Sequence, residues 1–301
     1  MIFKKLNVCL IGCVKSSDIA FDALLENKKI NFKLLICSKK STFNSDFVDL
    51  GKKAKKKKID FFYEENIKDF NVQRKILDNH KIDLVFVIGW SKIIKEPVLS
   101  FYKNKIIGFH PAELPKNRGR HPLIWALVLG LKKTASTFFF LTKEPDAGDI
   151  LNQKIIKISN KDYAKDLYNK VLKVIPVQIN EIIDNFINDS INPIRQLKKD
   201  SNVWRKRSEI DGKIDWRMNS KNIYNLVRAL ADPYPGAYFI YNKKKFLVSN
   251  SKIVNIKIDN QEPGRIIKNN SKELIVKTGD MAISFSKKQF KDKIEGEFFY
   301  E

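Results

Sequence analysis

Two side chains, those of His110 and Asp146, have the chemical types and the local settings that proton transfer requires. His110 follows an apolar run and precedes Pro111, so its imidazole is expected to stand where a strand ends. Asp146 lies in the turn-forming sequence PDAGD, shortly after the aromatic residues 138–140. A carboxylate that meets an imidazole fixes its tautomer and favours its protonated form. An isolated histidine more often packs a loop, but the acidic turn favours a pair, and we predict His110 and Asp146 as catalytic residues.

A run of hydrogen-bond donors lies between these two residues in the sequence. Segment 114–122 holds, beside Gly119, the donors Lys116, Arg118, Arg120 and His121. Because guanidinium groups bind phosphate through two parallel hydrogen bonds, this segment is a candidate site for a phosphorylated substrate. A solvated basic turn explains the same composition equally well.

The elements that would position these residues follow an α/β pattern. Short apolar runs alternate with longer mixed segments, as expected for buried parallel strands joined by helices. Strands are expected at 7–13, 32–37, 59–63, 83–88, 105–109 and 134–141. Helices are expected at 47–54, 122–131 and 163–187, and one more is expected to begin near Ser17, which would cap it. This is the pattern of a doubly wound open sheet, which binds ligands beyond the carboxyl ends of its strands. We expect His110 and the loop after Leu141 to lie at that edge.

A break in the pattern at Ser190, Asn192 and Pro193 marks the expected domain boundary. It separates a catalytic domain, residues 1–195, from a C-terminal domain, residues 203–301. Short strands are expected in the latter at 213–216, 237–241, 245–249, 254–258, 265–267, 273–276 and 282–285, with one helix at 222–230. Such spacing is typical of a small β-barrel.

Composition leaves the partner open. The net charge of +23 over 301 residues suggests attraction to an anion such as nucleic acid or a phosphorylated metabolite. The lysines are scattered through every segment, however, so a solvated basic surface is the simpler explanation. Residues 12–17 could bind a phosphate at the start of a helix. The sequence has no glycine-rich dinucleotide or ATP motif, however.

The cysteines and the apolar runs bear on the compartment. Cys9, Cys13 and Cys37 lie in apolar stretches without neighbouring ligands, so we expect small buried side chains in a reducing compartment and no metal site. No run is long enough to span a membrane, and the start lacks the features of a signal peptide. A cytoplasmic protein without membrane association is expected.

The segments that contain the candidate pair resemble a known family. FHPAELPKNRGRHPLIW and TASTFFFLTKEPDAGDIL resemble formyltransferases that use 10-formyltetrahydrofolate, a family that includes methionyl-tRNA formyltransferase and the nucleotide-sugar N-formyltransferases. WRKRSEIDGKIDW and NLVRALADPYPGAY resemble the start of that family's second domain, so nearly the whole chain is covered. RGR-x-P-x-x-W, ADPYPGAY and FVIGWSKI are closer to the sugar enzymes. The resemblance implies a Rossmann-like, mostly parallel sheet followed by a small barrel-like domain.

The resemblance also implies roles for residues. His110 and Asp146 match two members of the family's Asn-His-Asp centre, whereas Gly108 takes the place of the Asn that donates to the formyl oxygen. Asn117, His121 or a backbone N–H is a candidate replacement, while Asn104 lies too far back along the strand. Contacts with the folate co-substrate are implied for Ile88, Trp90, Ile93, Leu114 and Thr142. Contacts with the nucleotide sugar are implied for Asn117, Arg118, Arg120 and His121.

These observations predict an enzyme that transfers a formyl group from 10-formyltetrahydrofolate to the amine of a nucleotide-linked amino sugar, as surface polysaccharide biosynthesis requires. One alternative is formylation of methionyl-tRNA, which the positive charge and the second domain favour. Another is a folate- or nucleotide-binding protein without catalysis, which Gly108 suggests. The expected partner is a small nucleotide sugar, or tRNA under the first alternative. A homodimer is one option, and the sequence does not fix the oligomeric state.

Overall fold

The computed structural model describes residues 5–41, 44–256, 258–290 and 292–299. The chain forms two compact units. The first comprises the described residues up to Gly119, Ala135–Ile156 and Lys170–Trp204, and the second comprises Arg120–Thr134, Lys157–Asn169 and the described residues from Arg205 onward. Two segments that we expected in the first domain, 120–134 and 157–169, therefore belong to the second unit.

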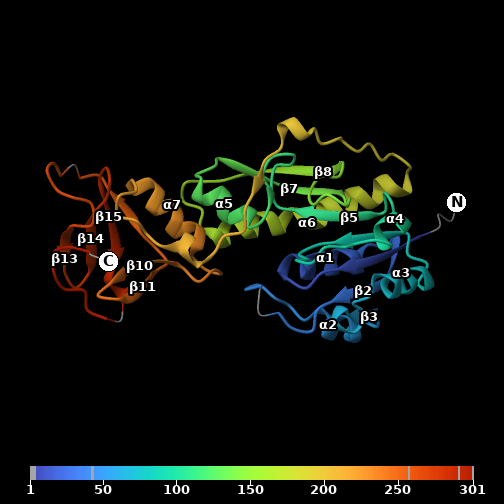
Figure 1. Cartoon of the computed structure of the whole chain (residues 1–301). Helices are drawn as coiled ribbons and strands as arrows, with labels where there is room; N and C mark the ends of the chain where they lie inside the picture. Colours follow the sequence, from blue (N-terminus) through green and yellow to red (C-terminus); the bar gives the residue numbers. More distant parts are fainter. Residues whose placement is uncertain (1–4, 42–43, 257, 291, 300–301) are drawn as a thin grey trace. The chain divides into compact units, whose positions relative to one another are not determined.

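The first unit is built on a seven-stranded sheet of order β3-β2-β1-β4-β5-β7-β8 within the described residues (Figure 1). Its strands are β1 (Leu6–Ile11), β2 (Ile30–Cys37), β3 (Asp60–Tyr63), β4 (Leu84–Val87), β5 (Ile106–His110), β7 (Lys133–Phe140) and β8 (Ile150–Lys157). The first five of these in spatial order, from β3 to β5, are parallel to one another. Every residue of β4 is buried, as expected for a central parallel strand.

Four helices accompany these strands in the described chain, and a fifth is shared by both units. They are α1 (Lys15–Glu26), α2 (Leu50–Lys57), α3 (Phe70–Asn79), α4 (Val98–Phe101) and the shared α6 (Ala164–Ile187). The long α6 lies beside β7 and β8 (Figure 1), where Gln178 bonds Ser136 and Glu181 bonds Asn152. The predicted apolar stripe of α6 is confirmed, because all five of its members are fully buried: Leu167, Val171, Ile175, Ile179 and Ile183.

The start of α1 differs from the expectation that Ser17 caps it. The helix begins at Lys15 and its N-cap is Val14. The Ser17 hydroxyl accepts a hydrogen bond from the Val14 N–H and donates one to the Ile88 carbonyl, at 3.2 and 2.6 Å. Because this hydroxyl joins the helix start to the end of β4, it serves the fold and not a phosphate.

The second unit contains α5 (Pro122–Val128), α7 (Ser220–Leu230) and two antiparallel sheets. One sheet pairs β10 (Ala237–Tyr241) with β11 (Lys244–Val248). The other has the order β12 (Lys252–Val254), β15 (Ala282–Ser286), β14 (Glu273–Lys277), β13 (Ile266–Asn269). The fold class is as predicted, an α/β domain followed by antiparallel strands.

Two strand predictions in this unit were wrong. Residues 213–216 form no strand, and only Lys213 makes an isolated bridge, to Tyr238. The strand expected at 254–258 begins where β12 ends, and its residue 257 lies outside the described residues. Across the described chain, none of the helices is both long and apolar enough to cross a membrane.

Candidate active site

His110 is the last residue of β5, and its imidazole is held by a backbone carbonyl. The side chain is buried, at 6% exposure, and its Nε2 lies 2.9 Å from the carbonyl oxygen of Asn117. A carbonyl only accepts hydrogen bonds, so Nε2 carries a proton. In the neutral ring the lone pair is then on Nδ1.

Asp146 faces this second nitrogen. Its Oδ2 lies 3.8 Å from His110 Nδ1 and accepts a hydrogen bond of 2.9 Å from the Gly119 N–H. The residue has a left-handed backbone, with φ of +57°. Two residues on, a Cβ at Gly148 would lie 1.8 Å from the Phe140 carbonyl oxygen, so only glycine fits this turn. The structure thus brings the two predicted catalytic residues together.

The route by which Asp146 reaches His110 differs from our expectation. We placed the loop after Leu141 beyond the carboxyl edge of the parallel strands. Strand β7 is antiparallel to β5, so Leu141 instead bonds Ile106, at the amino end of β5. Asp146 meets His110 because the segment after Leu141 turns back to Gly119.

Arg118 was predicted to bind substrate, but its guanidinium is engaged within the protein. The side chain is 4% exposed; its Nε and Nη2 donate to Gln196 Oε1 at 3.2 and 2.8 Å, and its Nη1 lies 3.4 Å from Glu144 Oε1. The residue sits in the short strand β6 (Arg118–Gly119), which pairs with β9 (Val203–Trp204). These contacts favour a structural role for Arg118 over a phosphate contact.

The structure has no free space at Gly108 for the asparagine side chain that the resemblance implies at this position. A Cβ built there would lie 2.4 Å from Leu141 Cδ2 and 3.0 Å from the Phe139 ring. The space that an asparagine side chain would need is therefore filled by apolar neighbours. Asn104 is exposed and precedes β5 at the end opposite His110, so it does not replace the donor.

Asn117 is the candidate replacement that lies against His110. Its carbonyl accepts the His110 Nε2–H, and its N–H donates to Asn202 Oδ1 at 2.9 Å. Its side-chain amide has no hydrogen-bond partner among the residues that the structure describes. The backbone is left-handed, with φ of +65°, a conformation that asparagine tolerates better than most residues.

The residues predicted to contact folate fall into two groups. Ile88 and Leu114 are buried, and their carbonyls accept hydrogen bonds from Ser17 and Gln153. Their side chains pack in the interior, so the predicted folate contacts of these two residues stay a prediction. The side chains of half-buried Trp90, of Ile93, which is 60% exposed, and of exposed Thr142 remain accessible to a ligand.

Arg120 and His121, also predicted to bind substrate, belong to the second unit. His121 precedes α5, and its Nδ1 lies 3.3 Å from the Arg207 N–H. Burial, and then the charges of Arg120 and Arg207, lower the pKa of His121. The Arg207 guanidinium lies over the Trp125 ring, 4.5 Å from its centroid. This part of the second unit is positively charged and carries a neutral imidazole.

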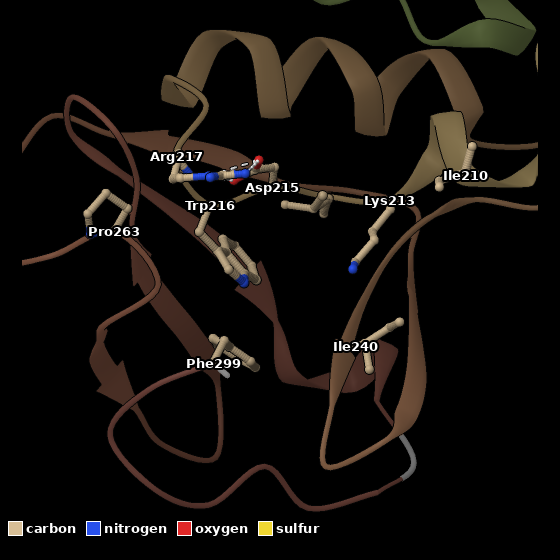
Figure 2. Close-up of a pocket in the computed structure, with 9 residues that line it drawn as sticks. Ile210, Lys213, Asp215, Trp216, Arg217, Ile240, Pro263 and Phe299 are labelled. Atoms are coloured by element: carbon tan, nitrogen blue, oxygen red, sulfur yellow. Dashed lines mark hydrogen bonds and ion pairs between the residues drawn. The ribbon is translucent and has the colours of Figure 1, made fainter. Parts of the chain in front are cut away.

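The second unit also has a cavity of about 530 Å³. Figure 2 shows the Lys213 ammonium and the Trp216 indole directed into the same space, with Ile240 and Phe299 at its walls. The Trp216 ring is stacked on Phe299, with centroids 5.0 Å apart. None of the residues predicted for catalysis or binding lines this cavity.

Sequence reasoning missed three groups that hold the predicted catalytic pair or the backbone beside it. They are the Gly119 N–H, the Gln196 amide and the Asn202 side chain. Gln196 and Asn202 lie in an irregular segment after α6 and carry no periodic pattern, motif or charge that would have pointed to them.

The fold and the pair define the class of this protein. Residues 16–181 match the formyl transferase family, and residues 206–300 match the formyl transferase C-terminal domain. The first match alone covers more than half of the chain, so the chain belongs to the formyltransferase family. The resemblance predicted from the motifs is confirmed.

Individual relatives differ in what they share with the chain. The bifunctional polymyxin resistance protein ArnA of Wigglesworthia glossinidia brevipalpis is 38% identical over 207 residues, covering 69% of this chain and 32% of that protein. The chain thus spans about a third of the length of that relative. Methionyl-tRNA formyltransferase of Buchnera aphidicola subsp. Acyrthosiphon pisum is 28% identical over 235 residues, covering 78% of this chain and 74% of that one.

A solved structure extends the likeness of fold to nearly the full length. The N-formyltransferase from Helicobacter canadensis, solved in complex with folinic acid and dTDP-3-aminofucose, superposes with a TM-score of 0.73 at 19% identity. The superposition covers 93% of this chain and 99% of that one.

Proposed function

We propose that this chain transfers the formyl group of 10-formyltetrahydrofolate to the amine of a nucleotide-linked amino sugar. The observation that carries the chemistry is the separation of 3.8 Å between His110 Nδ1 and Asp146 Oδ2 in a formyltransferase fold. The choice of a sugar is supported by the near-complete superposition on an enzyme solved with a nucleotide amino sugar. The motifs RGR-x-P-x-x-W and ADPYPGAY support the same choice.

The co-substrate supplies the formyl carbon, and the chain supplies a suitable surface for it. Trp90 offers an aromatic ring in the loop after β4, and Ile93, three residues further on, offers an exposed apolar side chain. A flat pteridine fits such a wall. Thr142, whose hydroxyl donates to the Glu144 carbonyl, borders the loop that carries Asp146.

The two facing acceptors can take the proton of the attacking amine. With Nε2 protonated, His110 Nδ1 and Asp146 Oδ2 are both acceptors, 3.8 Å apart. A donor nitrogen can lie within about 2.9 Å of both, which is ordinary hydrogen-bond distance. The pair thus holds the substrate ammonium and removes a proton, which frees the nitrogen lone pair for attack. Because the Asn117 carbonyl accepts the Nε2–H of His110, this imidazole has no proton left to donate to the formyl oxygen.

The formyl oxygen then needs a donor other than His110. Attack forms the new C–N bond and places negative charge on this oxygen. The Asn117 amide is the donor that we assign to it, in place of the asparagine that Gly108 replaces. Collapse of the intermediate breaks the bond from carbon to the folate nitrogen, which takes the proton held by the pair and leaves as tetrahydrofolate. The freed pair accepts the second proton of the attacking nitrogen, which gives the neutral formamide.

A mass-shift assay tests the substrate. The purified chain is incubated with 10-formyltetrahydrofolate and, separately, with dTDP- and UDP-linked amino sugars and with initiator methionyl-tRNA. Formylation adds about 28 Da, one CO unit, to the acceptor. We expect this gain on an amino-sugar nucleotide. If neither an amino-sugar nucleotide nor methionyl-tRNA gains this mass, the proposal is overturned.

Formylation of methionyl-tRNA is the second candidate function. It is favoured by the 28% identity with the Buchnera methionyl-tRNA formyltransferase and by the net charge of +23. A polyanion such as tRNA is attracted by such a charge. A gain on methionyl-tRNA alone in the assay above would select this function.

A further inference from the structure

We propose that Gln196 is a positioning residue that holds the Asp146 turn in its reactive place, with Arg118 fixing the orientation of its amide. The proposal rests on the proposed function only in giving Asp146 the task of proton acceptor. Gln196 lies 50 positions beyond Asp146 in the sequence, in a segment with no regular structure.

The Gln196 amide bridges the turn that presents Asp146. Its Nε2 donates to the carbonyls of Asp146 and Gly148, at 3.0 and 2.6 Å, and the residue is only 9% exposed. One NH₂ group thus holds the backbone on both sides of Ala147. Because Asp146 has a left-handed backbone that is costly for a non-glycine residue, an external restraint is needed to keep it there.

Arg118 decides which way the amide points. A guanidinium only donates, so the Gln196 oxygen must face Arg118 and the NH₂ must face the two carbonyls. The reversed amide would oppose donors to donors and acceptors to acceptors. The two bonds from Arg118 to Gln196 Oε1, at 2.8 and 3.2 Å, are buried and therefore cannot be replaced readily by water.

Strand β6 also holds the side chain of Asp146. Gly119, next to Arg118, gives its N–H to Asp146 Oδ2 at 2.9 Å. Backbone and carboxylate of Asp146 are thus both held by groups that depend on strand β6. A displacement of about 1 Å at such a group can cost roughly a hundredfold in rate.

The test compares two buried glutamines of the first unit. Gln196→Met removes the bridge while keeping an unbranched side chain of similar size. Gln178→Met is the matched control: Gln178 is fully buried and bonds Ser136 and Asn152, outside the proposed site. We expect Gln196→Met to lower kcat roughly a hundredfold, with KM for both substrates little changed, and Gln178→Met to leave kcat near wild type.

A second readout does not depend on turnover. Hydrogen exchange of the Gly119 amide should accelerate in Gln196→Met and not in Gln178→Met, since that amide is bonded to Asp146. Gln196→Glu should act like Gln196→Met, because a carboxylate cannot donate to the two carbonyls. Should Gln196→Met fail to fold, Gln196→Asn, with the amide withdrawn by one methylene, gives the same comparison.

The outcomes separate this proposal from the proposed function. If Gln196→Met matches Gln178→Met in kcat and in Gly119 exchange, the positioning role is wrong, even when Asp146→Asn is inactive. If the wild type formylates no acceptor, the proposed function fails, and the exchange of Gly119 still decides whether Gln196 holds the turn.

Discussion

The Nε2–H of His110 donates to the carbonyl of Asn117 at 2.9 Å, seven residues further along the chain. This bond fixes the tautomer and aims the other ring nitrogen at Asp146, 3.8 Å away. It also brings the backbone of Asn117 to the predicted catalytic pair, in a chain with Gly108 where the resemblance places an asparagine.

Asn117 offers a direct test of what replaces that asparagine. Asn117→Gly removes the amide while suiting the left-handed backbone, so the carbonyl that holds His110 stays in place. We expect kcat to fall by about two to three orders of magnitude, as for loss of one oxyanion donor. Thermal unfolding should remain close to wild type, and Asn117→Asp, which keeps the shape and loses the donor, should be equally slow. A wild-type rate for Asn117→Gly would exclude the amide as the donor.

The packing at Gly108 predicts a coupling with Leu141. Gly108→Asn places new atoms against Leu141 Cδ2, which lies 2.4 Å from the position of a Cβ, and should cost about 1–3 kcal/mol of unfolding free energy. Adding Leu141→Ala makes room. In denaturant unfolding, the double variant should lose less unfolding free energy than the two single variants lose together, by about 1 kcal/mol or more. Simple additivity would show that the two positions do not share this space.

The cysteines should be unreactive in the folded chain. Burial raises the pKa of the Cys13 thiol to about 11 and that of Cys37 to about 12, and it also raises the pKa of fully buried Cys9. Only the thiolate reacts, and at pH 8 a thiol of pKa 11 is ionised to roughly one part in a thousand. Iodoacetamide should therefore label none of the three in native protein and all three in urea. Labelling of a native cysteine would contradict the burial.

Asp211 should make stability depend on pH in the acid range. Hydrogen bonds from Arg205, with support from the Ser208 N–H, hold the pKa of Asp211 well below its usual range. A carboxyl with a lowered folded pKa stabilises the protein above its unfolded pKa, about 3.9, and this contribution is lost as the pH falls further. Asp211→Asn should lower the Tm at pH 7, and the difference from wild type should shrink towards pH 3. A difference that stays constant with pH would contradict the pairing.

Elements with strong patterns were predictable from the sequence, and elements held by long-range contacts were not. The stripe of α6 and the apolar run of β4 were read correctly because burial imposes periodicity on them. Strand β8, ILNQKIIK, was missed since it lies at the sheet edge and keeps polar residues. Helix α3 was missed although Asp69 caps it and Ile76 and Leu77 lie on its apolar face.

The sequence predicted a pairing of His110 with Asp146, which the structure brings within 3.8 Å, but not the groups that hold the two side chains. The pairing was predictable because a strand end precedes Pro111 and a glycine turn follows Asp146. The direction of β7 could not be read from its sequence, because the side chains of a strand point to alternate faces in parallel and antiparallel pairs alike. The substrate contact predicted for Arg118 rests on its charge, and the sequence did not reveal its buried partner, Gln196.

The measurement that tests the central claim most directly is the rate of formyl transfer by Asp146→Asn. The amide keeps the size of the side chain and an oxygen for the Gly119 N–H, but it cannot accept a proton. We expect the transfer rate to fall by about two to four orders of magnitude, with unchanged thermal unfolding and unchanged binding of folinic acid. Transfer at the wild-type rate by Asp146→Asn would contradict the account.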